Sequence, residues 1–271
     1  AFNANGESQQ GIFMIDASKG FIKDGNKNRL RAQDIHKIVD AFNREQEIPR
    51  FSRMVPLSEI AANDFNLNIP RYIDSSDPED LHDLSGHLAG GIPDHDIDAL
   101  SAYWNIFPTL RQDLFEPARP GYSNARVEAG KVKSTILAHP EFASFRDGAL
   151  IPFENWYAEC RLDEIARGDS PKQLIEEIGE SLLAAYASEA TVDVPLLENY
   201  AIYQLLMDYW MDVMQDDVYV LSQDSWQAGK VLRELIVEKG EKLKETPDLV
   251  IGKKKYKAEI LPPALLVTRY F

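Results

Sequence analysis

The residues of this chain that could most readily do chemistry stand in the stretch MQDDVY, where Asp216 and Asp217 are adjacent. Two neighbouring carboxylates could form a catalytic or metal-binding pair. A hard cation requires further oxygen ligands, and only Asp212 and Gln215 offer them nearby in the sequence. The alternative is a structural role, in which one Asp occupies a turn and its carboxylate accepts hydrogen bonds from backbone N–H groups. We expect this structural role, with the acid pair at a sharp exit from a helix into a strand.

A second group of possible metal ligands lies between residues 79 and 96. His82 and His87 are five residues apart, and this spacing does not place them on one face of a helix. The sequence contains no H-E-x-x-H and no C-x-x-C, and Cys160 has no adjacent histidine. The residues therefore favour solvated acidic helices, and a metal-dependent enzyme that uses the acidic clusters remains an alternative. The other members of the group are His95, Glu79, Asp83, Asp94 and Asp96.

The glycines indicate whether the chain could hold a nucleotide or a methyl-donor cofactor. Such sites need clustered glycines, because the backbone must turn tightly and approach the ligand. All 15 glycines are scattered and no G-x-G occurs. We therefore expect no cofactor in this chain.

Charge restricts where a nucleic acid could bind. The net charge of −15 argues against a protein that binds DNA over its whole surface. The middle of the sequence is strongly acidic and both ends are mildly basic, so any DNA contact should fall near the ends. For the run of lysines in the expected hairpin, a plainer interpretation than DNA contact is an exposed turn with a charged strand edge. The candidate contacts are Lys23, Lys27, Arg29, Arg31, Lys253, Lys254 and Lys255.

Periodicity predicts the elements that position these residues. The strongest helix covers 195–215 and carries a buried stripe of Tyr203, Met207, Trp210 and Met214 at helical spacing. Asp34 is expected to cap a helix whose apolar positions are Ile35, Ile38, Val39 and Phe42. Further helices are expected over 77–91, 94–107, 170–190 and 224–240. Strands are expected at 12–16, at 217–221 and in a hairpin over 249–260, and 24–31 reads as a polar loop.

Composition sets the broad class. The chain has 271 residues, of which 44% are hydrophobic, as in globular proteins of one or two domains. No apolar run approaches the roughly 20 residues that span a bilayer. One cysteine fits a reducing compartment. The C-terminus stops within the apolar run LLVTRYF, whereas natural domain ends are usually polar, and the N-terminus AFNANGESQQ has no initiator Met. We therefore expect a piece of a longer protein.

Four long segments resemble the modification (methylation) subunits of type I restriction–modification systems. These segments are IFMIDASKGFIKDGNKNRLRAQDIHKIVDAF (12–42), SEIAANDFNLNIPRYID (58–74), YAIYQLLMDYWMDVMQDDVYVL (200–221) and AEILPPALLVTRYF (258–271). The family consists of adenine-N6 DNA methyltransferases that use S-adenosylmethionine and act with a specificity subunit and a restriction subunit. Its cofactor motif contains G-x-G and its catalytic motif is N-P-P-[FY]. Neither motif occurs here. The Pro-Pro pair at 262–263 is preceded by Leu261 and followed by Ala264, so it does not match the catalytic motif.

The resemblance implies a mainly α fold in two parts. Residues 1–75 would be the C-terminal remnant of a Rossmann-like α/β methyltransferase domain, and 76–271 a helical domain with a short hairpin near 249–260. The implied setting is the prokaryotic cytoplasm, and the implied partners are the other two subunits and DNA, with no membrane. No catalytic, cofactor-binding or metal residue carries over, so assembly and DNA enclosure are the expected functions. A generic helical interaction module is a further alternative.

Overall fold

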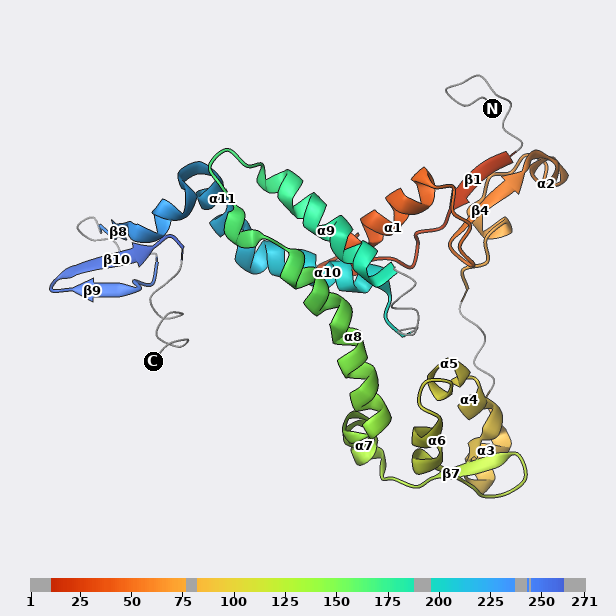
Figure 1. Ribbon diagram of the computed structural model, residues 1–271. Coiled ribbons are helices and arrows are strands. Elements are labelled where there is room, and N and C mark those ends of the chain that lie inside the picture. Colours follow the sequence, from red (N-terminus) through yellow and green to blue (C-terminus); the bar gives the residue numbers. More distant parts are fainter. Residues whose placement is uncertain (1–10, 77–81, 188–195, 237–242, 244, 261–271) are drawn as a thin grey trace. The chain divides into compact units, whose positions relative to one another are not determined.

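The computed structural model describes residues 11–76, 82–187, 196–236, 243 and 245–260. The chain separates into two compact units. The first comprises residues 1–152 with 187–204, and the second comprises 153–186 with 205–271. In the described part of the chain no helix is both long and apolar enough to cross a membrane. Helices dominate and the sheets are small (Figure 1), which confirms the mainly α prediction.

The first unit begins with a two-stranded antiparallel sheet. Strand β1 (Gly11–Ile15) pairs with β4 (Ser52–Pro56), with Phe13 opposite Met54, so the strand expected at 12–16 is confirmed. The sheet packs with helix α2 (Leu57–Ala62) and the short helix η1 (Ile69–Arg71). Their shared apolar core consists of Met14, Val55, Ile60, Tyr72 and Ile73.

A hairpin and a helix lie between these two strands. The segment 24–31, expected to be a loop, instead forms most of the hairpin of β2 (Ile22–Asp24) and β3 (Lys27–Arg29). Gly25 turns it with φ +59°, a conformation that glycine adopts without steric cost. Helix α1 (Ala32–Asn43) follows. Asp34 caps it from inside the first turn, where its carboxylate accepts the backbone N–H of Arg31 at 2.9 Å, so the predicted N-cap position was wrong by three residues.

The rest of the first unit is a set of short helices around a small sheet. Strand β7 (Tyr122–Ala125) lies between β5 (Ile92–Pro93) and β6 (Phe115–Pro117). The helices expected over 77–91 and 94–107 are shorter than expected where the structure describes them. The core comprises Phe107, Leu110 and Leu114. The helices are α3 (Leu84–Ala89), α4 (Asp94–Asp98), α5 (Ser101–Trp104), α6 (Pro108–Leu114), η2 (Ala129–Lys131), α7 (Val132–Ala138) and α8 (Pro140–Glu159).

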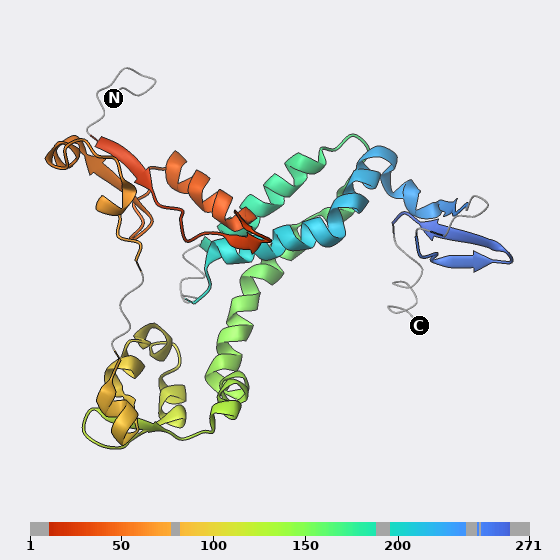
Figure 2. The same ribbon diagram turned by 180° about the vertical axis from the view of Figure 1, so that it is seen from behind.

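The second unit contains the end of α8 and a group of packed helices. Helix α9 (Pro171–Ala187) and the helical run from α10 (Asn199–Tyr209) to α11 (Gln215–Asp224) lie side by side in both views (Figures 1 and 2). A π-helical segment, Trp210–Met214, joins α10 to α11. The core includes Ile165, Trp210, Val218, Leu221, Ala228 and Ile260.

The second unit ends in a three-stranded antiparallel sheet. Strand β10 (Lys254–Ala258) lies between β8 (Leu232–Glu234) and β9 (Leu249–Ile251). The hairpin expected near 249–260 is therefore confirmed, with its turn at Gly252–Lys253. The short helix η3 (Leu162–Glu164) precedes α9, and η6 (Ser225–Lys230) follows α11.

Two predicted elements at this end were wrong. The strand expected at 217–221 is helix α11, because Val218 and Leu221, three residues apart, both reach the core and only helical spacing allows this. The helix expected over 224–240 is instead η6 followed by strand β8, as far as the structure describes it. There β8 gains ladder hydrogen bonds from β10 that outweigh its helical propensity.

Candidate functional site

The β2–β3 hairpin presents three of the predicted DNA contacts to solvent. Lys23, Lys27 and Arg29 are all exposed. The Lys23 ammonium donates to the Asn28 side-chain oxygen at 2.7 Å and lies 5.4 Å from the centre of the Phe21 ring. Arg29 lies 3.2 Å from the carboxylate of Asp24, and both side chains are more than half exposed. Such surface pairs are weak, so these cations are free to exchange their partners for phosphates.

Arg31 differs from the other predicted contacts because it has a structural partner. Its guanidinium donates to both carboxylate oxygens of Asp34 at 2.8 Å. These hydrogen bonds raise the pKa of Arg31 and lower the pKa of Asp34. Arg31 therefore stabilises the start of α1 and is the least available of the four N-terminal cations.

The other predicted contacts lie on the hairpin of β9 and β10, in the second unit. Lys253, Lys254 and Lys255 are exposed. Lys254 donates to Glu234 of the neighbouring strand β8 at 2.8 Å, and this hydrogen bond raises the pKa of Lys254. The structure thus places the seven cations in two clusters, one in each unit.

The acid pair does not mark the end of a helix. Asp216 and Asp217 lie in the first turn of α11, which continues directly from the π-helical segment. The predicted exit into a strand was therefore wrong. Burial, and then the charge of Asp216, raise the pKa of Asp217. Across the residues that the structure describes, no three His, Cys, Asp or Glu side chains form a group that could hold a metal ion.

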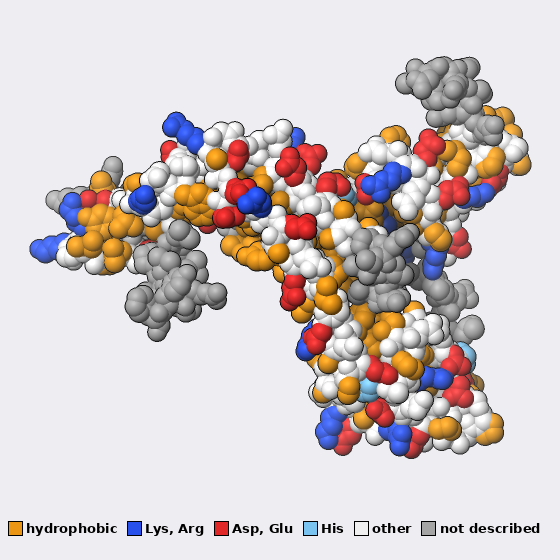
Figure 3. All heavy atoms as spheres, in the orientation of Figure 1, with side chains coloured by type: hydrophobic (Ala, Val, Ile, Leu, Met, Phe, Trp, Pro, Cys, Tyr) orange, Lys and Arg blue, Asp and Glu red, His pale blue; other side chains and the backbone are white. Residues whose placement is uncertain are grey.

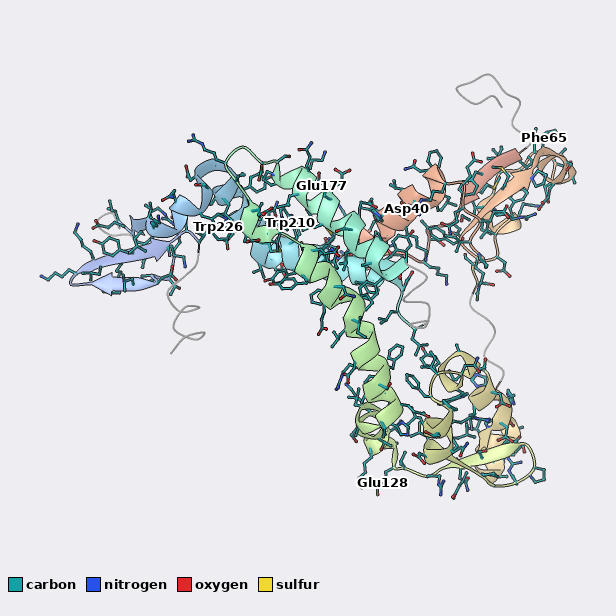
Figure 4. All side chains as sticks on the ribbon, viewed as in Figure 1. Asp40, Phe65, Glu128, Glu177, Trp210 and Trp226 are labelled. Atoms are coloured by element: carbon teal, nitrogen blue, oxygen red, sulfur yellow. The ribbon has the colours of Figure 1, made fainter. Side chains whose placement is uncertain are left out.

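The predicted stripe on α10 is largely inside the molecule. Trp210, labelled in Figure 4, is 4% exposed in the core of the second unit, and Met207 and Met214 pack against that core. Tyr203 is half-buried and stacks on His36, with ring centres 4.6 Å apart. The periodicity of the sequence therefore located three core residues and one aromatic contact.

The sequence did not indicate a seam, within the first unit, between α1 and the start of α10. The Tyr200 hydroxyl donates to the Asp40 carboxylate at 3.0 Å, and Lys37 lies 3.0 Å from Glu198. The backbone N–H of Gln33 donates to the side chain of Gln204 at 3.0 Å. The i,i+4 pair of His36 and Asp40 lies within α1 and does not indicate the partner helix. This seam joins residues that were predicted to belong to two different domains.

A buried acid also ties the end of β1 to the segment after η1. Asp16 is 9% exposed, and its carboxylate accepts the Ser18 backbone N–H at 2.9 Å and the Ser75 hydroxyl at 2.5 Å. Hydrogen bonds from Ser18 and Ser75 lower the pKa of Asp16. Asp16 is thus a clamp that holds residue 75 beside the sheet.

The loop after α2 holds an aromatic ring on strained backbone. Asp64 and Phe65 both have φ of +56°, which is unfavourable for residues with a bulky side chain. The Phe65 ring is 71% exposed (Figure 4). Strain of this kind often accompanies a functional position. The asparagine and aspartate residues of the loop are typical of turns, but they do not single out Phe65.

The N-terminal part of the chain matches a known protein family. Residues 2–81 match the model of the N-6 DNA Methylase family. The MpnII methylase subunit of a type I restriction enzyme from Mycoplasma pneumoniae is 26% identical over 123 residues, which cover 45% of this chain and 22% of the relative. Over these residues the chain is similar to the methylation subunits of type I restriction enzymes. This confirms the resemblance that the sequence suggested.

Archaeal methylation subunits give the same result over a shorter stretch. The MjaVII methylase subunit of Methanocaldococcus jannaschii is 39% identical over 80 residues, 28% of this chain and 14% of the relative. The MjaVIII subunit of that organism is 33% identical over 76 residues, 27% and 13% of the two chains. The alignments with methylation subunits thus cover less than a quarter of each relative's length, and no solved structure matches the chain.

Proposed function

We propose that this chain acts within an adenine-N6 DNA methyltransferase of the type I restriction–modification kind. Its part in that enzyme is subunit assembly and DNA enclosure, and methyl transfer takes place outside these 271 residues. The observation that carries the proposal is the match of residues 2–81 to the N-6 DNA Methylase family, in a sequence that contains neither G-x-G nor N-P-P-[FY]. The partners are the specificity and restriction subunits and DNA.

The geometry supports the division of labour that we propose. The Asp16 clamp holds the part that resembles the methylase family together, from residue 16 to residue 75. The α1–α10 seam joins that part to the start of α10. The β2–β3 hairpin carries exposed cations, and one of them, Lys23, lies over the ring of Phe21. A hairpin that carries lysine and arginine can neutralise backbone phosphates, which supplies most of the affinity in non-specific DNA binding.

The cofactor part of the proposal is tested by titration calorimetry with S-adenosylmethionine. We expect no heat of binding to this chain, because it offers no glycine loop that would let the backbone approach the ligand. Binding in the micromolar range would contradict the proposal, since it would require a cofactor site among these residues. A full-length methylation subunit serves as the positive control.

The DNA part is tested by fluorescence anisotropy with a labelled duplex over a series of salt concentrations. Lys23→Glu with Lys27→Glu should weaken binding and reduce the slope of log K against log salt by about 0.9 for each phosphate that the hairpin no longer neutralises. The control with the same change of net charge is Lys131→Glu with Lys133→Glu, two exposed lysines of η2 and α7 outside both hairpins. An equal loss of affinity in the control would show that only net charge matters, and this would remove the hairpin from the proposed DNA interface.

The assembly part is tested by mixing the chain with the specificity subunit of the same system and separating the products by size-exclusion chromatography. We expect a stable complex. Failure of the two proteins to co-elute at micromolar concentration would contradict an assembly role.

A further inference from the structure

The run from α10 to α11 exposes an apolar stripe on a side of the helix that does not face the core. Leu205, Tyr209 and Val213 follow one another at intervals of four residues, which places them on one face. Their side chains are 69%, 55% and 53% exposed. Leu206 and Trp210, the next residues in the chain after Leu205 and Tyr209, are 9% and 4% exposed. The helix therefore has a buried apolar side and a second, uncovered one.

A line of carboxylates accompanies this stripe. Asp208, Asp212 and Asp216 are exposed and are also four residues apart, so they run parallel to the apolar stripe along the helix. In a regular α-helix residues four apart drift by about 40° per step, because each residue turns the chain by about 100°. The π-helical segment closes on a hydrogen bond from the Gln215 N–H to the Trp210 carbonyl, a wider turn that offsets this drift. Both lines consequently stay straight across the junction.

The charge around this surface has one sign over a long stretch. Lys172 and Lys230 bound 57 consecutive residues, 173–229, that contain no lysine or arginine. In Figure 3, acidic side chains lie at the surface over the helices of the second unit, with hydrophobic side chains exposed between them. The acids within 173–229 are Glu176, Glu177, Glu180, Glu189, Asp193, Glu198, Asp208, Asp212, Asp216, Asp217 and Asp224.

We propose that the stripe of Leu205, Tyr209 and Val213, with the acidic line beside it, is a docking surface for a basic amphipathic helix of a partner protein. An amphipathic helix presents apolar anchors at intervals of three and four residues, which match a stripe of this spacing. Lysines or arginines that flank those anchors would meet the acidic line, and complementary charge fixes the partner and its register. The proposal rests on the second unit alone and stands independently of the proposed function.

The acidic line also decides against other occupants. A DNA backbone would meet the carboxylates of Asp208, Asp212 and Asp216 along this line, which is repulsive. A second copy of the same face would bring two acidic lines together, and like charges across an interface oppose association. A basic partner helix removes both conflicts, because it covers the apolar stripe and neutralises the acids.

The test uses labelled synthetic peptides and the whole chain in fluorescence anisotropy at about 0.15 M salt. The probe is a helical peptide with leucine at the anchor positions and lysine beside them. One control peptide has the same composition in scrambled order, and the other has glutamate in place of lysine. We expect saturable binding of the probe and at least a tenfold weaker binding of both controls. Equal binding of the scrambled peptide would overturn the proposal, because charge alone would then account for it.

Variants of the chain locate the surface. Tyr209→Ser with Val213→Ser, and Asp212→Lys with Asp216→Lys, should each weaken probe binding at least fivefold. The matched charge control is Glu176→Lys with Glu177→Lys on α9, which changes the net charge equally on an exposed part of another helix. The matched apolar control is Leu232→Ser with Val250→Ser, two exposed positions on the β8–β10–β9 sheet. A loss of affinity in the controls as large as in the test variants would overturn the assignment.

Two further measurements test where the probe binds and whether the chain associates with itself. Hydrogen exchange should slow along residues 205–216 when the probe is bound, and protection confined to other residues would contradict the proposal. Sedimentation of the free chain identifies a competing occupant. If the chain dimerises and Tyr209→Ser with Val213→Ser abolishes the dimer, the surface is an interface between copies and the proposal fails.

Discussion

Helices α1 and α10 carry similar apolar stripes in sequence, and the structure treats them in opposite ways. On α10 the stripe faces the core, with Trp210, the next residue after the helix, 4% exposed. On α1 the expected stripe faces solvent, with Ile35, Val39 and Phe42 exposed by 51%, 46% and 65%. The helices meet through polar and aromatic side chains, including Asp40 and Tyr200. Periodicity thus identified both helices but the buried face of only one.

The difference arises from what lies beside each helix. The run α10–α11 has apolar neighbours at Ile165 and Ile260, so its large side chains gain contacts that exclude water. Helix α1 instead buries small or polar residues, Ala41 and Asp34, and Asp34 is satisfied by Arg31. A sequence specifies the spacing of an apolar stripe, but the neighbours that cover it come from distant segments.

The largest expected effect comes from removing the centre of the covered stripe. Trp210→Ala should lower the free energy of unfolding by about 3–5 kcal/mol, since it deletes a large buried side chain and leaves a cavity. Urea denaturation followed by circular dichroism measures this loss. The matched control is Trp226→Ala, a tryptophan of the same unit that is 41% exposed and should cost much less. Equal losses would mean that Trp210 does not anchor the core.

The contrast also shows how much of the fold can be predicted from the sequence. The strand at 12–16, the hairpin near 249–260 and the helix at 170–190 were predictable, because alternation, a glycine turn and Ser170 followed by Pro171 are local signals. Helix α11 was not, because VYVL has β-forming residues and only its distant core partners decide between helix and strand. The hairpin at 22–29 was missed although its two-residue loop, Gly25–Asn26, is a known hairpin signal.

The candidate site divides in the same way. The exposed lysines of both hairpins could be located from charge alone. The pairing of Tyr200 with Asp40 joins residues 160 positions apart, and no local pattern encodes it. The domain boundary at 75/76 remains a prediction, although the seam shows that residues on its two sides are in contact. Sequence therefore supplied the side chains of the site and left their juxtaposition to the fold.

A second prediction concerns the seam. Tyr200→Phe removes the hydroxyl that donates to Asp40, and should lower the free energy of unfolding by about 1 kcal/mol. Asp40→Ala should cost a similar amount, and the double variant should cost less than the sum because the two groups form one interaction. Tyr219→Phe on α11 is the control, since that ring is 46% exposed. Strict additivity in the cycle would show that the hydrogen bond contributes nothing.

A third prediction uses pH to distinguish a half-buried carboxylate from an exposed one. Because burial raises the pKa of Asp217 above its usual 3.8, the folded chain holds this proton more tightly than the unfolded chain. The stability that it contributes is therefore present below about pH 3.8 and is lost as pH rises through the folded pKa. Asp217→Asn should leave stability unchanged at pH 3 and raise it near pH 7 by about a few tenths of a kcal/mol, a small gain because solvent still reaches the side chain.

Urea denaturation of the wild type and of Asp217→Asn between pH 3 and pH 7 measures this difference. The control is Asp212→Asn, which removes an exposed carboxylate of the preceding turn. A loss of stability at pH 7 in Asp217→Asn would mean that the carboxylate satisfies a partner in the native state. Burial would then not be the dominant effect on its pKa.

The smallest expected effect tests the uncovered stripe of α1. Phe42→Ser should change the free energy of unfolding by no more than about 0.5 kcal/mol, as is usual for exposed positions, because the ring is 65% exposed. The control is Ala41→Leu, one residue earlier, where the side chain is fully buried and overpacking should cost about 1–3 kcal/mol. Denaturation in urea compares the two. A loss above about 2 kcal/mol for Phe42→Ser would show that other residues of the chain cover this stripe in solution. Helices α1 and α10 would then obey the same rule, since each would bury the apolar face that its periodicity predicts.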